Sequence, residues 1–145
     1  MTGVTYQKTQ RATLILSLVL LAFLGFVFAA TASSPLVWIV GLVLAVIAYL
    51  FSSLTIRVDE ELVQWHFGPG FLRKSISLAE IASVESVRNK WWYGWGIRYT
   101  AHGWLYNVSG LDAVQLRLTS GRAVRLGTDE PARLCQAIQT SRGEA

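Results

Sequence analysis

The chain has 145 residues, of which 52% are hydrophobic, and a formal net charge of +4. That length accommodates about one domain, and the mean hydropathy of +0.40 is high for a globular chain. Lys8 and Arg11 supply +2 of the net charge and residues 57–145 supply the other +2. Because nucleic-acid binding usually needs a clustered basic stripe, no nucleic-acid partner is expected.

Two apolar runs without a charged residue follow the N-terminal segment. They extend over residues 12–32 and 35–54, and each meets the roughly 20 residues that a helix needs to cross a bilayer. Pro35 is tolerated in the first turn of the second helix, where its missing N–H has no intrahelical partner to lose. The runs predict a transmembrane helical hairpin, preceded by an N-terminal tail over residues 1–11.

The charges around this hairpin predict its orientation. Lys8 and Arg11 precede the first run and Arg57 follows the second, whereas the connecting turn has no charge. The positive-inside rule then predicts a multi-pass protein of the inner (plasma) membrane with both termini in the cytoplasm. An alternative is a secretory signal that is cleaved after Ala30-Thr31-Ala32. The first run is longer than usual for a signal, which favours the uncleaved helix.

Small residues at a spacing of four occur in both runs, as Gly25 with Ala29 and Gly41 with Ala45. Such pairs let the backbones of two membrane helices approach closely. The favoured interpretation is packing of the two helices of the hairpin on each other, and the alternative is an interface between copies of the chain.

Apolar and polar residues alternate from residue 54 onward, which is typical of half-buried strands. The alternation and the intervening turns predict about seven short strands, near residues 54–58, 63–67, 76–78, 84–87, 104–106, 114–118 and 124–126. A closing helix is expected in "GTDEPARLCQAIQ", because Leu134 and Ile138 lie one helical turn apart. The expected fold is therefore α+β: the helical hairpin, then, over residues 55–145, an antiparallel β-sandwich or partly open barrel that a C-terminal helix caps.

Residues 54–140 resemble the bacterial pleckstrin-homology-like (PH-like) domain that certain small bacterial integral membrane proteins carry. The most recognisable segments are "SISLAEIASVE" and "SGRAVRLGTDEP". The resemblance implies a seven-stranded pair of sheets capped by a helix, in a family whose members are not known as enzymes. The first hairpin turn contains Asp59, Glu60 and Glu61. Three carboxylates would repel a phosphate, so no phosphoinositide-type pocket is expected.

The chain contains few residues that could perform catalysis or hold a metal. His66 and His102 belong to different expected elements, and the single cysteine, Cys135, excludes an intrachain disulfide. No metalloprotease, phosphate-loop or nucleophile-elbow motif occurs. The sequence therefore predicts no enzyme activity, no metal and no cofactor.

The most unusual stretch is "KWWYGWGIRYTAHGWLYNVSG", residues 90–110, which holds four of the six tryptophans. Trp104 and Tyr106 alternate as in a strand, so at least one of them is expected to face inward. The segment Lys90-Trp91-Trp92-Tyr93-Gly94-Trp95, here called the aromatic loop (residues 90–95), has no alternation. Three alternatives stay open for it: packing on its own domain, contact with a membrane surface, and contact with a partner. Arg98 is a further candidate for contact with a membrane or partner. A structural ion pair of Arg98 with Asp112 or Asp129 is favoured over ligand contact.

These observations favour a non-catalytic, membrane-anchored module whose cytoplasmic domain mediates binding of a protein partner or self-association at the inner membrane. The alternative function is a lipid-interacting membrane protein or an accessory subunit of a membrane enzyme.

Overall fold

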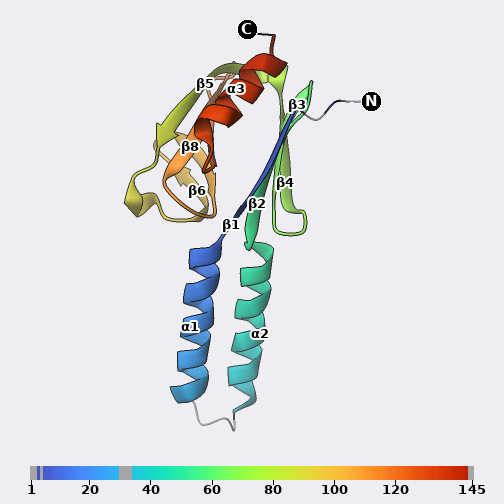
Figure 1. The fold of residues 1–145 in the computed structure, drawn as a ribbon. Coiled ribbons are helices and arrows are strands. Elements are labelled where there is room, and N and C mark those ends of the chain that lie inside the picture. Colours follow the sequence, from blue (N-terminus) through green and yellow to red (C-terminus); the bar gives the residue numbers. More distant parts are fainter. Residues whose placement is uncertain (1–2, 4, 30–33, 144–145) are drawn as a thin grey trace.

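The computed structural model describes residue 3, residues 5–29 and residues 34–143 (Figure 1). Within these residues the chain is α+β, with nine strands in two sheets and three α-helices. In chain order the elements are β1 (Tyr6–Arg11), α1 (Thr13–Ala29), α2 (Pro35–Leu50), β2 (Ser53–Val58), β3 (Leu62–Phe67), β4 (Phe71–Ser77), the 3₁₀ turn η1 (Leu78–Glu80), β5 (Ile81–Arg88), the 3₁₀ turn η2 (Trp91–Tyr93), β6 (Gly96–Thr100), β7 (Gly103–Asn107), β8 (Asp112–Leu118), β9 (Ala123–Gly127) and α3 (Pro131–Ser141).

The first sheet is antiparallel, in the order β1-β2-β3-β4. Its outer strand β1 lies in the segment that was expected to be a tail. Tyr6 lies opposite Val58, and Arg11 lies opposite Ser53. The hairpin of α1 and α2 is therefore inserted between two neighbouring strands of one sheet. Leu54, Ile56 and the other inward residues of β2 and β3 are buried, as their alternation predicts.

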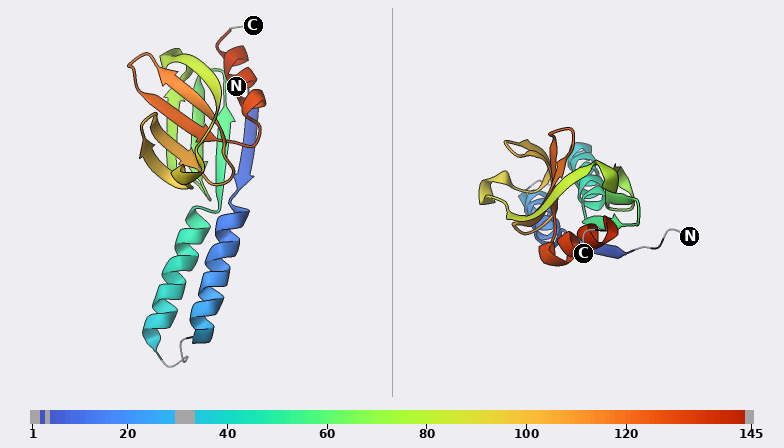
Figure 2. Two further views of the ribbon diagram at one scale, coloured as in Figure 1. Left: turned by 90° about the vertical axis from the view of Figure 1, so that its left-hand side faces the viewer. Right: turned by 90° about the horizontal axis from the view of Figure 1, so that it is seen from above.

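The second sheet has the order β5-β8-β9-β7-β6, in which only the β7–β9 pair is parallel. The inner faces of the two sheets form one core, and α3 packs against β2, β5 and β8 at one side of it (Figure 2). Leu134 and Ile138 of α3 are completely buried. The helix expected at the C-terminus and its inward residues are therefore confirmed.

The helices α1 and α2 lie side by side and point away from the β-domain (Figure 2). They have 17 and 16 residues, and no helix in the described ranges combines the length and apolar character needed to cross a membrane. The prediction of a transmembrane hairpin over residues 12–32 and 35–54 is therefore wrong, and so is the inner-membrane, multi-pass location inferred from it. The alternative cleavage site at residues 30–32 lies outside the described residues.

The error has a structural cause at the end of the second run. Helix α2 ends at Leu50, and the chain then turns at Phe51 and Ser52 into β2. Leu54 is apolar because it belongs to the core of the β-domain, where it is completely buried. The length of the apolar run therefore overstates the length of the helix.

Two of the nine strands were not expected from the sequence. One is β1, and the other is β6, which pairs with β7 at the edge of the second sheet. β6 begins at Gly96 with a φ of 99°, and it contains exposed Tyr99 and Arg98. Because its outward residues are not consistently polar or apolar, β6 lacks the alternation that marks a half-buried strand.

Candidate functional site

The aromatic loop (residues 90–95) forms a short, hydrogen-bonded turn between β5 and β6. The N–H of Tyr93 donates to the carbonyl of Lys90 at 3.0 Å, and the N–H of Gly94 donates to that of Trp91 at 3.4 Å. Gly94 ends the turn with a φ of 65°, a conformation that side-chain-bearing residues rarely adopt. The glycine thus allows the chain to leave the 3₁₀ turn and enter β6.

The rings of this loop are held mainly at the surface. Trp91 and Trp92 are 76% and 58% exposed, and their rings meet edge to face with centroids 5.8 Å apart. Tyr93 contacts Trp92 in the same manner, and Nζ of Lys90 lies 5.0 Å from the centroid of Trp92, within cation–π range. The arrangement presents two tryptophans in a preformed geometry, next to a positive charge.

A buried polar network lies below the loop. Arg125 Nε donates to Gln115 Oε1 at 2.7 Å, and its NH1 donates to Asn89 Oδ1 at 3.2 Å. The N–H of Asn89 donates to the carbonyl of Leu111 at 2.7 Å. All three side chains are buried, and burial lowers the pKa of Arg125. The network fixes Asn89, the residue immediately before the aromatic loop.

Arg125 lies on the outer face of the second sheet, because its neighbours Val124 and Leu126 point into the core. The network therefore joins the loop to the sheet from outside. Sequence reasoning missed it, since an arginine in a strand ordinarily marks the solvent side. The available signal was Gln115 and Arg125 on two strands of the expected hairpin, where they lie directly opposite each other.

Trp95, at the end of the loop, is less exposed than Trp91 and Trp92. It is 38% exposed and lines a groove of about 500 Å³ between the hairpin and β6, together with Ile15, Ile47, Phe51 and Ile97. Arg98 lies at the same groove, and its Nε donates to the carbonyl of Trp95 at 3.4 Å. The structure thus divides the sequence-predicted contact residues between the outer sheet face and this groove.

Arg98 forms no ion pair with Asp112 or Asp129 in the described part of the chain. Asp129 instead contacts Lys8 of β1. Of the two later aromatic residues, Tyr106 is buried in the core and Trp104 is 47% exposed. The prediction that at least one of them faces inward is therefore confirmed.

The small residues of the hairpin have different surroundings. The backbone of Gly41 lies against the ring of Phe23, where a Cβ atom would overlap the ring, whereas Gly25 has open space around it. Ala45 lines an apolar groove of about 840 Å³ between the helices, together with Phe23 and Trp38. Ala29 is the last residue of α1, and its side chain lies outside the described part. One small residue, Gly41, is thus placed in direct contact between the helices.

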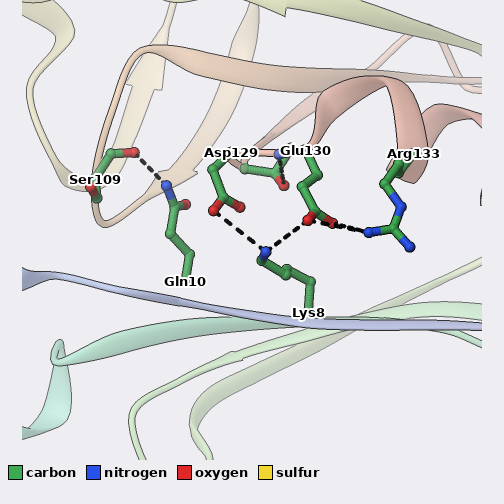
Figure 3. Close-up of polar contacts among 7 residues, drawn as sticks. Lys8, Gln10, Ser109, Asp129, Glu130 and Arg133 are labelled. Atoms are coloured by element: carbon green, nitrogen blue, oxygen red, sulfur yellow. Dashed lines mark hydrogen bonds and ion pairs between the residues drawn. The ribbon is translucent and has the colours of Figure 1, made fainter.

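A second polar cluster, which the sequence did not suggest, joins β1 to the start of α3 (Figure 3). Lys8 Nζ lies 2.9 Å from Glu130 Oε1 and 3.5 Å from Asp129 Oδ2, and Arg133 contacts Glu130 at 3.3 Å. The hydrogen bond with Glu130 raises the pKa of Lys8, and the same bond lowers the pKa of Glu130. Gln10 Nε2 donates to the carbonyl of Ser109 at 3.1 Å. The cluster holds the first strand against two loops of the β-domain.

The described residues contain no group of three or more His, Cys, Asp or Glu side chains that could hold a metal ion. His66 lies on β3 and His102 in the turn between β6 and β7. Cys135 is half-buried against the core, and burial raises the pKa of its thiol. In the first hairpin, Arg57 Nε donates to Asp59 Oδ1 at 2.9 Å. The absence of enzyme activity, of a cofactor and of a phosphoinositide-type pocket all stay predictions.

Comparisons of the chain with protein-family models, with curated proteins and with solved structures find no match. The resemblance to PH-like domains therefore stays a prediction, which rests on the sequence segments that carry it. Any function must be argued from the surfaces described above.

Proposed function

We propose that the protein is a non-catalytic association module whose β-domain binds a protein partner through the aromatic loop (residues 90–95). The observation that carries the proposal is the exposure of Trp91 and Trp92 in a loop with a fixed conformation. Tryptophan and arginine dominate the energetics of protein interfaces. A preformed loop also loses less conformational entropy on binding than a flexible one.

The buried network under the loop supports the same proposal. Asn89 is held by Arg125 and by the backbone of Leu111, so the loop starts from a fixed point on the sheet. Loops that only connect strands rarely keep two large apolar rings exposed, because exposure forgoes the free energy of burying them. A partner that covers both rings would recover that free energy.

Photocrosslinking tests the proposal. A photoreactive phenylalanine analogue is placed at position 91 of the full-length chain in cells, and a matched one at Tyr99, which is 74% exposed on β6 outside the loop. A protein captured from position 91 and not from position 99 is then purified, and its Kd for the chain is measured. We expect the double variant Trp91→Ala, Trp92→Ala to raise this Kd at least about tenfold.

Capture of lipid alone at position 91, or equal binding of the partner to the double variant, would overturn the proposal. The two substitutions are expected to leave folding unchanged, because both rings are largely exposed and their removal leaves the core intact. An unchanged denaturation midpoint is the control for that point.

Self-association through the hairpin is the second candidate. Apolar side chains are exposed on both helices, among them Phe28 at 94%, Leu42 at 67% and Leu21 at 65%. An exposed apolar surface of this extent is unusual for a protein that stays monomeric in water. Sedimentation of the full-length chain in a mild detergent tests this candidate. A stable dimer that Leu42→Glu dissociates supports it, and a monomer at all concentrations contradicts it.

A further inference from the structure

The stretch of chain around the aromatic loop contains cations and no carboxylate. Arg88, Lys90 and Arg98 lie between residues 86 and 111, and no Asp or Glu does. These three cations give the stretch a formal charge of +3, compared with +4 for the whole chain. Positive charge is thus concentrated in the part of the chain that holds the two exposed tryptophans.

Two of these cations contact the aromatic loop, one at each end. Nζ of Lys90 lies 5.0 Å from the ring centroid of Trp92. Nε of Arg98 donates to the carbonyl of Trp95 at 3.4 Å, and a Cβ atom at Gly94 would lie 3.4 Å from the NH2 of Arg98. Both charged side chains are exposed. The loop therefore presents its rings between two positive charges that a partner can reach.

The carboxylates closest in sequence do not neutralise these two cations. Glu85 lies 3.7 Å from Arg117, and Asp112 lies opposite Arg88 in the β5–β8 register. Within the described ranges, neither cation at the loop forms an ion pair with a carboxylate. Both of them are therefore available to a carboxylate that a partner supplies.

A third cation lies beneath the loop and is buried. Arg125 is 7% exposed, and its hydrogen bonds go to the neutral side chains of Gln115 and Asn89. It forms no ion pair with a carboxylate of the described residues. Buried charges are ordinarily paired, because a charge in the interior is screened much less than one in water. The positive field of Arg125 therefore adds to that of the two surface cations.

The same arrangement disfavours a basic partner. Lys90 already occupies the cation–π position at Trp92, and like charges that meet across an interface weaken it. A nucleic acid is also less suited to this surface, because its phosphates are usually bound by a longer row of cations than the two at the loop. Carboxylates next to an apolar side chain match both the charges and the rings.

We infer that the partner presents an acidic segment to the aromatic loop. Its carboxylates lie against Lys90 and Arg98, and an apolar side chain between them packs on Trp91 and Trp92. The inference rests on the proposed function, and it adds the chemistry of the partner to the position of the contact. Because complementary charges speed association, the rate of binding falls as the salt concentration rises.

Selection from a random peptide library tests the inference. A phage library of short random peptides is first depleted on the full-length double variant Trp91→Ala, Trp92→Ala and is then selected on the parent chain. Peptides that need the two tryptophans are retained in this way, whatever their charge. Their sequences are expected to contain more Asp and Glu, and fewer Lys and Arg, than the unselected library.

The tightest of these peptides then supplies a matched pair of probes, the peptide itself and a neutral form in which Asn and Gln replace every Asp and Glu. The neutral form is expected to have a Kd at least about tenfold higher, since hydrogen bonds to charged groups are the strong ones. Lys90→Gln, Arg98→Gln is expected to raise the Kd of the acidic peptide at least about fivefold and to remove the preference for it. Lys74→Gln, Arg122→Gln, which removes two exposed cations outside the loop, is expected to leave this Kd unchanged.

The inference is overturned if the retained peptides show no acidic excess, or if the neutral form binds as tightly as the acidic one. In both cases the loop still binds peptides, so the proposed function stands. If no peptide distinguishes the parent chain from the tryptophan variant, the proposed function falls and the inference falls with it.

Three further results bear on the charges at the loop. An equal loss of binding in Lys74→Gln, Arg122→Gln would overturn the inference, because the effect would then come from net charge alone. Tighter binding of phosphatidylglycerol vesicles or of poly(U) RNA through the same two tryptophans would also overturn it. All the substituted cations are exposed, so an unchanged denaturation midpoint of each variant is the control for folding.

Discussion

Lys8 Nζ lies 2.9 Å from Glu130 Oε1, so a side chain of the first strand contacts the start of the last helix across 122 residues of sequence. The contact joins β1 to α3, which follows all the described strands in the chain. Gln10 of the same strand also reaches the loop at Ser109.

Removal of the Lys8 charge is expected to loosen β1. In Lys8→Met the strand keeps its ladder with β2 but loses its contact with the α3 start. Amide hydrogen exchange in residues 6–11 should accelerate by roughly two- to fivefold, because exposed ion pairs contribute little free energy. Arg133→Met, which removes the other cation at Glu130, is the control and should leave these rates unchanged. Equal acceleration throughout the β-domain would show that the contact does not act locally.

The same pair predicts a dependence on pH. Folding lowers the pKa of Glu130, so its contribution is complete above the ordinary value of 4.5 and is lost as the pH falls through the lowered folded value. Folding raises the pKa of Lys8, so its contribution is complete below 10.5 and is lost as the pH rises through the raised value. The difference in denaturation midpoint between the parent chain and Glu130→Gln should therefore shrink from about pH 7 to about pH 3. A constant difference over that range would contradict the prediction.

Arg125→Met should destabilise the β-domain and release the aromatic loop. The substitution leaves the buried side chains of Asn89 and Gln115 without their partner, which costs about 1–3 kcal/mol in the free energy of unfolding. Urea denaturation measures the loss. Arg117→Met is the control on the same sheet face, since Arg117 is exposed and contacts Glu85 at 3.7 Å. Equal losses of unfolding free energy in the two variants would show that the buried network stabilises the domain no more than an exposed ion pair does.

Leu134→Ala should be among the most damaging single changes in the β-domain. The side chain is completely buried between α3 and the core, and such truncations cost about 2–5 kcal/mol in the free energy of unfolding. Gln139→Ala, on the exposed side of the same helix, should change the stability little. Thermal unfolding of both variants gives the comparison, and a small effect of Leu134→Ala would contradict the packing of α3 described here.

The two glycines of the hairpin should differ in their tolerance of side chains. Gly41→Leu places a side chain where the ring of Phe23 lies, whereas Gly25→Leu extends into open space. Overpacking typically costs about 1–3 kcal/mol, while leucine in place of an exposed helical glycine gains up to about 1 kcal/mol in helix propensity. The helical circular dichroism signal should thus melt at a lower temperature for the first variant only. The reverse order would show that the helices pack through other faces.

Some features of the fold follow from local pattern and others depend on partners far away in sequence. Alternation identified the inward residues of β2 and β3, and the spacing of Leu134 and Ile138 identified α3. The strand β1 reads Tyr-Gln-Lys-Thr-Gln-Arg, which has no apolar alternation, and its pairing partner β2 lies beyond the hairpin. Its position therefore could not be predicted from its own residues.

The candidate sites show the same division. The composition of the aromatic loop marked it as unusual, but the sequence left open whether its rings were buried. That question depends on Arg125 and Asn89, 36 residues apart, whose contact fixes the loop on the outer sheet face.

The position of the hairpin between β1 and β2 has a topological consequence. Arg11 and Ser53 lie opposite each other as the last and first residues of neighbouring antiparallel strands, which is the geometry that a two-residue turn closes in an ordinary β-hairpin. The helices α1 and α2 thus take the place that a reverse turn has in an ordinary β-hairpin. A chain in which a short Asn-Gly link replaces them is expected to keep the β1–β2 register, but it loses the contacts of Ala12, Ile15 and Phe51 with the core.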